Sequence, residues 1–173
     1  HDLNMLVHWL QRPATDPAVR HIAITLYRVA KESVICAALI DALHNGKKVT
    51  AFVEVQARFD EKANLYWGEA LENAGARVMY SYENVKVHCK LLLIERAEKR
   101  KRKRYAYLST GNFNERTSKV YSDTALLTAK TALTDEVAQV FRHLEDRSYS
   151  PQLDHLLIAP YMLRSKMEAL VDK

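Results

Sequence analysis

The apolar residues of this chain change period repeatedly, between the roughly two-residue period of a strand and the roughly 3.6-residue period of a helix. A strand pattern at residues 21–29 precedes a helix pattern at 31–46, and the same two patterns recur at 48–55 and 60–75. A glycine ends each helix pattern, which is typical of a left-handed helix cap. Such alternation indicates an α/β protein, and we expect a mixed β-sheet flanked by helices on both faces.

The rest of the chain continues this plan. Four more strands and a helix are predicted, at 76–82, 85–95, 104–110, 121–129 and 134–145. The connections are short, which argues against a domain boundary, and 173 residues suit one domain by the rule of roughly 150 residues per domain. We therefore expect a single domain over residues 1–173. Because the chain begins at His1 and ends inside a helical pattern, we expect it to be an excerpt of a longer protein.

The chain is basic, with a net charge of +5 and a pI near 9.2. This charge favours polyanionic partners such as nucleotides, polyphosphate or nucleic acid. Much of it lies in EKRKRKR, residues 98–104, which we expect to form the tip of a hairpin. Two interpretations of the basic loop 99–104 stay open: a solvated loop, or a patch that attracts an anionic substrate.

Two features bear on the cellular location. Cys36 and Cys89 show neither the spacing of a metal site nor that of a disulfide framework, which favours a reducing compartment. No apolar run approaches the ~20 residues of a membrane span, and no signal peptide pattern opens the chain. We expect a cytoplasmic protein; a longer parent protein can still associate with a membrane, but nothing in these residues requires it.

Two polar residues interrupt the apolar run KVHCKLLLIE, residues 86–95. Side chains alternate between the two faces of a strand, so His88 and Lys90 are expected to point to the same side. Burying an imidazole and an ammonium without partners costs on the order of several kcal/mol. The site therefore requires a compensating carboxylate or an anionic ligand, and we favour the anion.

Two arginines follow predicted strands, where ligands of open α/β sheets bind. Arg28 follows AITLY, residues 23–27, near the end of the first strand pattern, and Arg58 follows FVEVQA, residues 52–57, after the second. Each can form a surface ion pair, with Glu32, Glu54 and Asp60 as nearby candidates. Together they favour phosphate, because the guanidinium fork matches phosphate oxygens in a way that lysine does not.

A third polar cluster lies at residues 109–123, STGNFNERTSKVYSD. Glycine and asparagine are ordinary turn residues, so a plain turn is one interpretation. The segment follows the strand next to the His88 strand, which favours a role in binding. Gly111 lets backbone approach a ligand, and the amides of Asn112 and Asn114 and the hydroxyl of Tyr121 are neutral donors for phosphate oxygens.

These residues carry a resemblance to known families. His88, Lys90, Glu95, Gly111 and Asn114 stand at the spacing of the phospholipase D superfamily motif, in which Asp usually occupies the position of Glu95. More narrowly, the chain resembles the family 1 polyphosphate kinases in five consecutive segments, LYRVAKES, HNGKKVTAFVEVQARFDEKAN, KVHCKLLLIER, YLSTGNFNERTSKVYSD and ALLTA. The resemblance implies a phospholipase D-like half as the fold.

The resemblance also implies an activity: reversible transfer of the γ-phosphate of ATP to inorganic polyphosphate through a phosphohistidine. His88 would be the nucleophile, and Lys90 would neutralise the transferring group. Arg28 and Arg58 would belong to the phosphate and magnesium site, with Mg²⁺ as cofactor. Arginine has no lone pair to ligate a metal, so both would hold phosphate oxygens that also bind the ion. Tyr121 would lie at the nucleotide.

In that family a second, similar half completes the active site, and this chain holds one such motif. We expect the fragment to be inactive alone, with the second half of the same protein, ATP or ADP and polyphosphate as partners, homo-oligomerisation in the parent and no nucleic acid. Two alternatives stay open. One is a phosphodiesterase, nuclease or phosphatidyl transferase of the broader superfamily. The other is a nonenzymatic polyanion-binding module that uses the basic loop, although it lacks interleaved aromatic residues.

Overall fold

The computed structural model describes residues 3–56, 60–82, 85–99 and 101–172. Across these residues six strands form one sheet, in the order β3-β2-β1-β4-β5-β6. The strands are β1 (Val19–Leu26), β2 (Lys48–Val53), β3 (Arg77–Tyr80), β4 (Lys90–Glu98), β5 (Lys101–Ser109) and β6 (Ala125–Thr128). β1, β2 and β3 run parallel, whereas β4 is antiparallel to β1 and each later strand is antiparallel to its predecessor. The predicted mixed sheet is thus confirmed.

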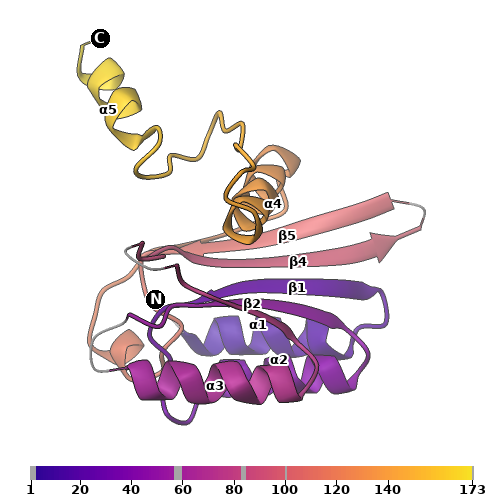
Figure 1. Ribbon diagram of the computed structural model, residues 1–173. Helices are drawn as coiled ribbons and strands as arrows, with labels where there is room; N and C mark the ends of the chain where they lie inside the picture. The colour runs from indigo at the N-terminus through magenta and orange to yellow at the C-terminus, as the bar shows by residue number, and fades with distance from the viewer. Residues whose placement is uncertain (1–2, 57–59, 83–84, 100, 173) are drawn as a thin grey trace.

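Helices cover both faces of this sheet, as predicted. The helices of the described residues are α1 (Leu3–Thr15), α2 (Val34–His44), α3 (Glu61–Asn73), the short 3₁₀ helix η1 (Thr117–Lys119), α4 (Thr131–Glu145) and α5 (Leu163–Val171). The first three pack on one face and α4 packs on the other, while α5 lies apart from the sheet (Figure 1). No helix in the described part of the chain is long and apolar enough to cross a membrane.

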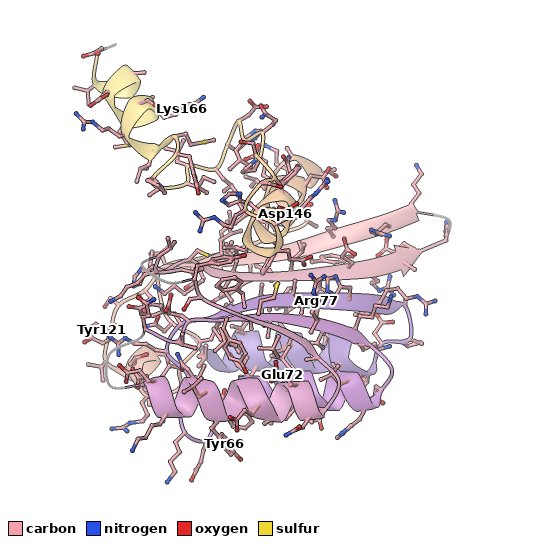
Figure 2. The ribbon with its side chains drawn as sticks, in the orientation of Figure 1. Tyr66, Glu72, Arg77, Tyr121, Asp146 and Lys166 are labelled. Carbon is pink, nitrogen blue, oxygen red and sulfur yellow. The ribbon has the colours of Figure 1, made fainter. Side chains whose placement is uncertain are left out.

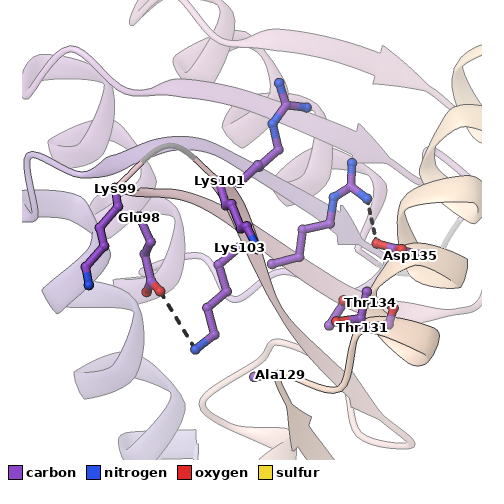
Figure 3. A pocket seen from close by; sticks show the side chains of 10 residues that line it. Glu98, Lys99, Lys101, Lys103, Ala129, Thr131, Thr134 and Asp135 are labelled. Atoms are coloured by element: carbon purple, nitrogen blue, oxygen red, sulfur yellow. Dashed lines mark hydrogen bonds and ion pairs between the residues drawn. The ribbon is translucent and has the colours of Figure 1, made fainter.

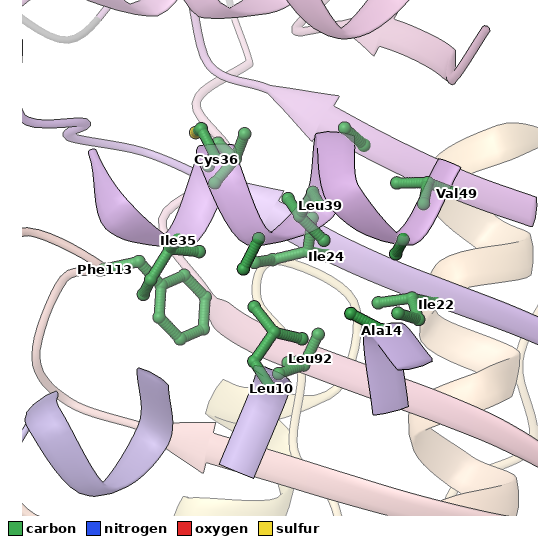
Figure 4. Packing of buried hydrophobic residues seen from close by; sticks show 14 of the residues in the cluster. Leu10, Ala14, Ile22, Ile24, Ile35, Cys36, Leu39, Val49, Leu92 and Phe113 are labelled. Carbon is green, nitrogen blue, oxygen red and sulfur yellow. The ribbon is translucent and has the colours of Figure 1, made fainter. Parts of the chain in front are cut away.

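Strand alternation divides the core into two layers. Ile22, Ile24 and Leu92 lie in the layer under α1 and α2, whereas their neighbours Ala23 and Leu93 lie in the layer under α4. Figure 4 shows the first layer. Burying each Ile or Leu side chain contributes about 1.5–3 kcal/mol, so both layers hold the central strands in place.

Two segments differ from the sequence predictions. β4 begins at Lys90 rather than at residue 85, so His88 lies in the irregular segment that leads into the strand. The basic run is mostly strand rather than loop: β5 begins at Lys101, and the chain turns at Lys99, whose φ is 54°. The strand predicted at 104–110 therefore begins three residues earlier than expected. Lysine and arginine give no apolar alternation, so periodicity missed residues 101–103, which are strand because their backbone pairs with β4.

The sheet topology gathers four chain segments at one end of the sheet. β1 and β2 end together, since Leu26 is in register with Val53. β4 begins at this end and β5 finishes there, since Lys90 is in register with Ser109. We call this end, where β1 and β2 finish, the carboxyl end of the sheet. In open α/β sheets, ligands bind beyond such an end.

Candidate active site

His88 and Lys90 are in direct contact at the carboxyl end of the sheet. The Lys90 Nζ atom lies 3.1 Å from both ring nitrogens of His88, and it donates a hydrogen bond to the His88 carbonyl oxygen at 2.7 Å. Lys90 is only 5% exposed, whereas the His88 ring reaches solvent. The structure therefore brings the two predicted residues together, with a buried ammonium beneath an accessible imidazole.

The surroundings favour the neutral form of His88. Partial burial lowers the pKa of His88 below its ordinary value of 6.5, and the positive charges of Lys90 and Arg28 lower it further. Burial also lowers the pKa of Lys90, and Arg28 adds to this effect, while Asp123 opposes it. At neutral pH the imidazole consequently keeps a nitrogen lone pair for attack on an electrophile.

Tyr27 lies at the centre of this group, and the sequence reasoning missed it. Its ring meets His88 edge-on at 4.4 Å between centroids. The Lys90 Nζ atom lies 4.9 Å from the Tyr27 ring centre, and the Arg28 Cζ atom lies 5.5 Å from it. Cations are attracted to the face of an aromatic ring, so Tyr27 holds two positive charges beside the histidine. Its position directly after β1 was the available signal.

The structure tests the prediction for only one of the two arginines. Arg28 forms an ion pair with Asp60, which lies directly before α3. Asp60 was one of the predicted carboxylate partners, so that interpretation of Arg28 is confirmed. Its guanidinium still lies near enough to His88 to affect the pKa of the imidazole. Arg58 lies outside the described residues, and its role stays a prediction.

Asn64 fixes the backbone from which Tyr27 projects. It is fully buried in α3. Its side-chain Nδ2 donates to the carbonyl oxygens of Tyr27 at 2.6 Å and Glu54 at 2.7 Å, and its Oδ1 accepts from the Val29 N–H at 3.0 Å. One amide thereby joins the segments that follow β1 and β2, and satisfies three buried backbone groups.

Glu54 positions the segment that leads to His88. The side chain is 1% exposed. Its Oε1 accepts hydrogen bonds from the Gln56 N–H and the Ser81 hydroxyl, and its Oε2 accepts one from the Val87 N–H, each at 2.7 Å. Because Val87 immediately precedes His88, this carboxyl group fixes the backbone position of the histidine.

Gly111 permits a close approach by Asp123. A Cβ atom added at Gly111 would lie 2.4 Å from the Asp123 Oδ2 atom, and the rest of that side chain would be nearly as close. Asp123 also accepts a hydrogen bond from the Thr110 hydroxyl at 3.1 Å. Since Asp123 raises the pKa of Lys90, the glycine places a carboxylate where it stabilises the buried ammonium.

The two predicted asparagines lie in the same connection. Asn114 is buried, and its Oδ1 accepts hydrogen bonds from the N–H groups of Arg116 and Thr117 at 3.0 and 3.2 Å, so it shapes the turn into η1. The Asn112 Oδ1 atom is buried and has no hydrogen-bond partner among the described residues. The turn interpretation therefore holds for the oxygen of Asn114, while binding by either amide stays a prediction.

Tyr121 lies at the same end of the molecule but at its surface (Figure 2). It is 65% exposed, and among the described residues no hydrogen bond or ring contact joins its side chain to His88. A cavity of about 760 Å³ also opens at this end, lined by residues that include Asp60, Tyr66 and Asn114. Ligand pockets of about 300–1,000 Å³ are common, so this cavity is large enough for a nucleotide.

Glu95, the acid of the sequence motif, does not take part in the His88 contacts. It lies in the middle of β4, where its carboxylate is 3.8 Å from His21, 2.8 Å from Arg104 and 3.5 Å from Arg102. His21 and then Arg104 lower the pKa of Glu95 to about 2, although burial opposes them. Glu95 therefore anchors the basic hairpin.

The donor groups at this site suit phosphate better than a protein-bound metal. In the described ranges no group of three His, Cys, Asp or Glu side chains could hold a metal ion. Mg²⁺ in phosphate-transfer sites is bound largely through substrate phosphates and waters, with one or two carboxylates. Asp60 beside Arg28 is such a carboxylate, so the site fits magnesium that arrives with a nucleotide.

Comparison with known structures identifies the class of fold. A phospholipase D family member from Salmonella typhimurium superposes with a TM-score of 0.60, at 15% identity, over 86% of this chain and 91% of that one. At this identity the similarity establishes the fold alone. The fold is thus phospholipase D-like, as predicted.

Sequence comparison identifies the family to which this chain belongs, which is narrower than the fold class. Residues 1–150 match the family model "Polyphosphate kinase C-terminal domain 1", and the chain belongs to that family. It is 43% identical to the polyphosphate kinase of Escherichia coli K12 over 173 residues, and 42% identical to that of Vibrio cholerae over 172 residues. The crystal structure of polyphosphate kinase from Porphyromonas gingivalis superposes with a TM-score of 0.86 at 39% identity, over 99% of this chain and 29% of that one. The chain spans about a quarter of the curated relatives' length, 25% for E. coli and 24% for V. cholerae.

Proposed function

We propose that this chain is the first catalytic half of a polyphosphate kinase, which transfers the γ-phosphate of ATP reversibly to inorganic polyphosphate through a phosphohistidine at His88. The observation that carries the proposal is the contact between an accessible imidazole and a buried ammonium, in surroundings that lower the pKa of His88. Membership of the polyphosphate kinase family supports the choice of substrates.

In the first step a ring nitrogen of His88 attacks the γ-phosphorus of ATP. The N–P bond forms while the bond from the γ-phosphorus to the β,γ-bridging oxygen breaks, and ADP leaves with that electron pair. In the second step a terminal oxygen of polyphosphate attacks the same phosphorus, and the N–P bond breaks. The polymer is then one phosphate longer, and the imidazole is neutral again.

Lys90 assists both steps. Its ammonium lies 3.1 Å from the ring nitrogens, so it can transfer hydrogen bonds from the imidazole to the oxygens of the arriving phosphoryl group. In a loose transition state, charge is spread over those oxygens, where a fixed cation stabilises it most. The phosphate also offsets the free-energy cost of burying Lys90.

The other predicted residues bind the substrates. Arg28 and Arg58 hold phosphate oxygens at the magnesium site, and Asn112, Asn114 and Tyr121 bind the nucleotide or its phosphates. When bound with ATP, Mg²⁺ neutralises charge on the β- and γ-phosphate oxygens.

The second catalytic half of the same protein completes the site in this proposal. The 173-residue chain is therefore expected to fold but not to turn over, and the parent is expected to form homo-oligomers. The assay that tests the function uses the full-length protein with ADP and long-chain polyphosphate, and measures ATP formation by luciferase. ATP formation supports the proposal. Cleavage of a phosphodiester such as bis(p-nitrophenyl) phosphate without ATP formation would overturn it in favour of the phosphodiesterase alternative.

A further inference from the structure

The basic hairpin has an open side. β6 pairs with β5 only from Ala106 to Ser109, so no strand in the described part of the chain pairs with that side of β5 at residues 101–105. A cavity of about 1000 Å³ lies along this open edge and extends to the start of α4. Lys103 turns toward Glu98 on one side of the edge, whereas Asp135 of α4 lies on the other (Figure 3). The lining of the cavity, which we call the β5 groove, includes Lys101, Lys103, Arg104, Thr131, Thr134 and Asp135.

Positive charge in the β5 groove is only partly neutralised. Arg104 is paired with Glu95 at 2.8 Å and with Asp135 at 2.7 Å. The carboxylate nearest to Lys103 is Glu98, at 3.9 Å, which also accepts a hydrogen bond from Arg96. Lys101 has no ion pair among the described residues, so the two lysines leave cationic charge available for an anion.

Two backbone features add to this attraction. Alternate residues of an unpaired strand edge direct their N–H groups outward. α4 begins at Thr131 beside the groove, and the side chain of its N-cap residue, Lys130, makes no capping hydrogen bond. The N–H groups of a helix N-terminus attract negative charge. The cationic side chains carry the argument, and these N–H groups strengthen it.

The lining of the groove indicates a polymer without bases. Single-stranded nucleic acids are held largely by stacking on aromatic side chains, and the described lining of the groove contains none. Tyr105 lies nearby, but the Lys103 Nζ atom is 5.4 Å from its ring centre and covers it. A linear anion bound by charge and N–H groups alone matches the groove better.

The groove lies far from His88. Lys103 and Lys101 are in register with Arg96 and Glu98, six and eight residues along β4 from Lys90, which corresponds to ~20–26 Å at the rise of an extended strand. They lie at opposite ends of the β4–β5 hairpin (Figure 1). A single ligand that reaches both must therefore be a long chain.

We propose that the β5 groove binds a distal segment of polyphosphate while the chain terminus lies at His88. This inference rests on the proposed function and adds a second binding site for the polymer. It makes affinity depend on chain length, because tripolyphosphate is too short to reach both sites.

The test replaces two lysines of β5 that line the groove in the full-length protein, as Lys101→Gln with Lys103→Gln. The matched control is Lys48→Gln with Lys166→Gln, which removes the same charge from exposed positions on β2 and α5. Calorimetry measures the Kd for long-chain polyphosphate and for tripolyphosphate at low ionic strength, and luciferase measures ATP formation. The variant loses two exposed charge interactions, each of modest strength, so it is expected to raise the Kd for the long chain about fivefold.

The expected pattern is weaker binding of the long chain by the groove variant alone, with unchanged binding of tripolyphosphate. An unchanged Kd for the long chain would overturn the inference, as would an equal loss in the control variant or an equal loss for tripolyphosphate. If the wild-type protein forms ATP and the groove variant binds normally, only the groove inference fails. If the wild-type protein forms no ATP, the proposed function fails, and the inference fails with it.

Discussion

The substitution Glu54→Gln tests how the fold positions His88. In the wild type, the Glu54 Oε2 atom accepts the Val87 N–H at 2.7 Å, inside the protein. Glutamine can keep one oxygen toward Gln56 and Ser81, but it then presents an amino group to the Val87 N–H. A buried donor left without an acceptor costs about 1–3 kcal/mol, and the opposed amino group adds to this cost. We expect the free energy of unfolding to fall by about 3 kcal/mol.

Two measurements on the 173-residue chain check this value. Chemical denaturation gives the free energy of unfolding, and hydrogen exchange of the Val87 amide is expected to accelerate roughly hundredfold, the equivalent of about 3 kcal/mol. Glu72→Gln is the matched control, because Glu72 is exposed and, among the described residues, its carboxylate accepts a hydrogen bond from the Tyr80 hydroxyl alone, at 3.2 Å. A loss of less than about 0.5 kcal/mol for Glu54→Gln, the range of ordinary surface changes, would refute the role given to this carboxyl group.

Three further predictions concern the neighbouring groups. Lys90→Met removes a positive charge that lowers the pKa of His88, so the acidic limb of the pH profile for phosphorylation of His88 is expected to move to higher pH; an unmoved limb contradicts this. Gly111→Ala sets a Cβ atom 2.4 Å from the Asp123 Oδ2 atom, and thermal unfolding is expected to show a loss of about 1–3 kcal/mol; unchanged stability would contradict that packing. The pKa of Glu95 falls from 4.5 to about 2 on folding, so its ion pairs stabilise the fold above pH 4.5 and the effect disappears as the pH falls towards 2. Glu95→Gln is expected to lower the free energy of unfolding by up to about 3 kcal/mol at pH 7, measured by urea unfolding at a series of pH values. If the stability of the variant falls as steeply as that of the wild type between pH 4.5 and 2, the pH dependence does not come from Glu95.

The sequence predicted the fold where apolar periodicity reports burial. Ile22, Ile24 and Leu92 point to one layer of the core and their neighbours to the other, so the strands were recognisable from alternation. The first residues of β5, 101–103, were not recognisable as strand, because they are basic and their pairing with β4 depends on the backbone. Likewise, His88 lies before β4 because backbone pairing, and not side-chain polarity, determines where the strand begins.

The candidate site was predicted only in part, because the sequence shows polar residues within apolar runs but not contacts between distant segments. His88 and Lys90 were conspicuous as polar residues in an apolar run, and their contact could be anticipated. The roles of Glu54 and Asn64 could not be anticipated, since they depend on contacts between segments that are distant in the sequence, and the only signal for Tyr27 was its position directly after β1. Asn64, for example, bonds the carbonyl oxygen of Tyr27, which lies 37 residues away.

The most direct test of the central claim is phosphorylation of His88. The full-length protein is incubated with Mg²⁺ and ATP labelled at the γ-phosphate, quenched in alkali and compared with His88→Ala. The account predicts a label on the wild type that is stable in alkali, labile in acid and lost in the variant. A label of the same stability and amount on His88→Ala would contradict it, and would place the nucleophile on another residue.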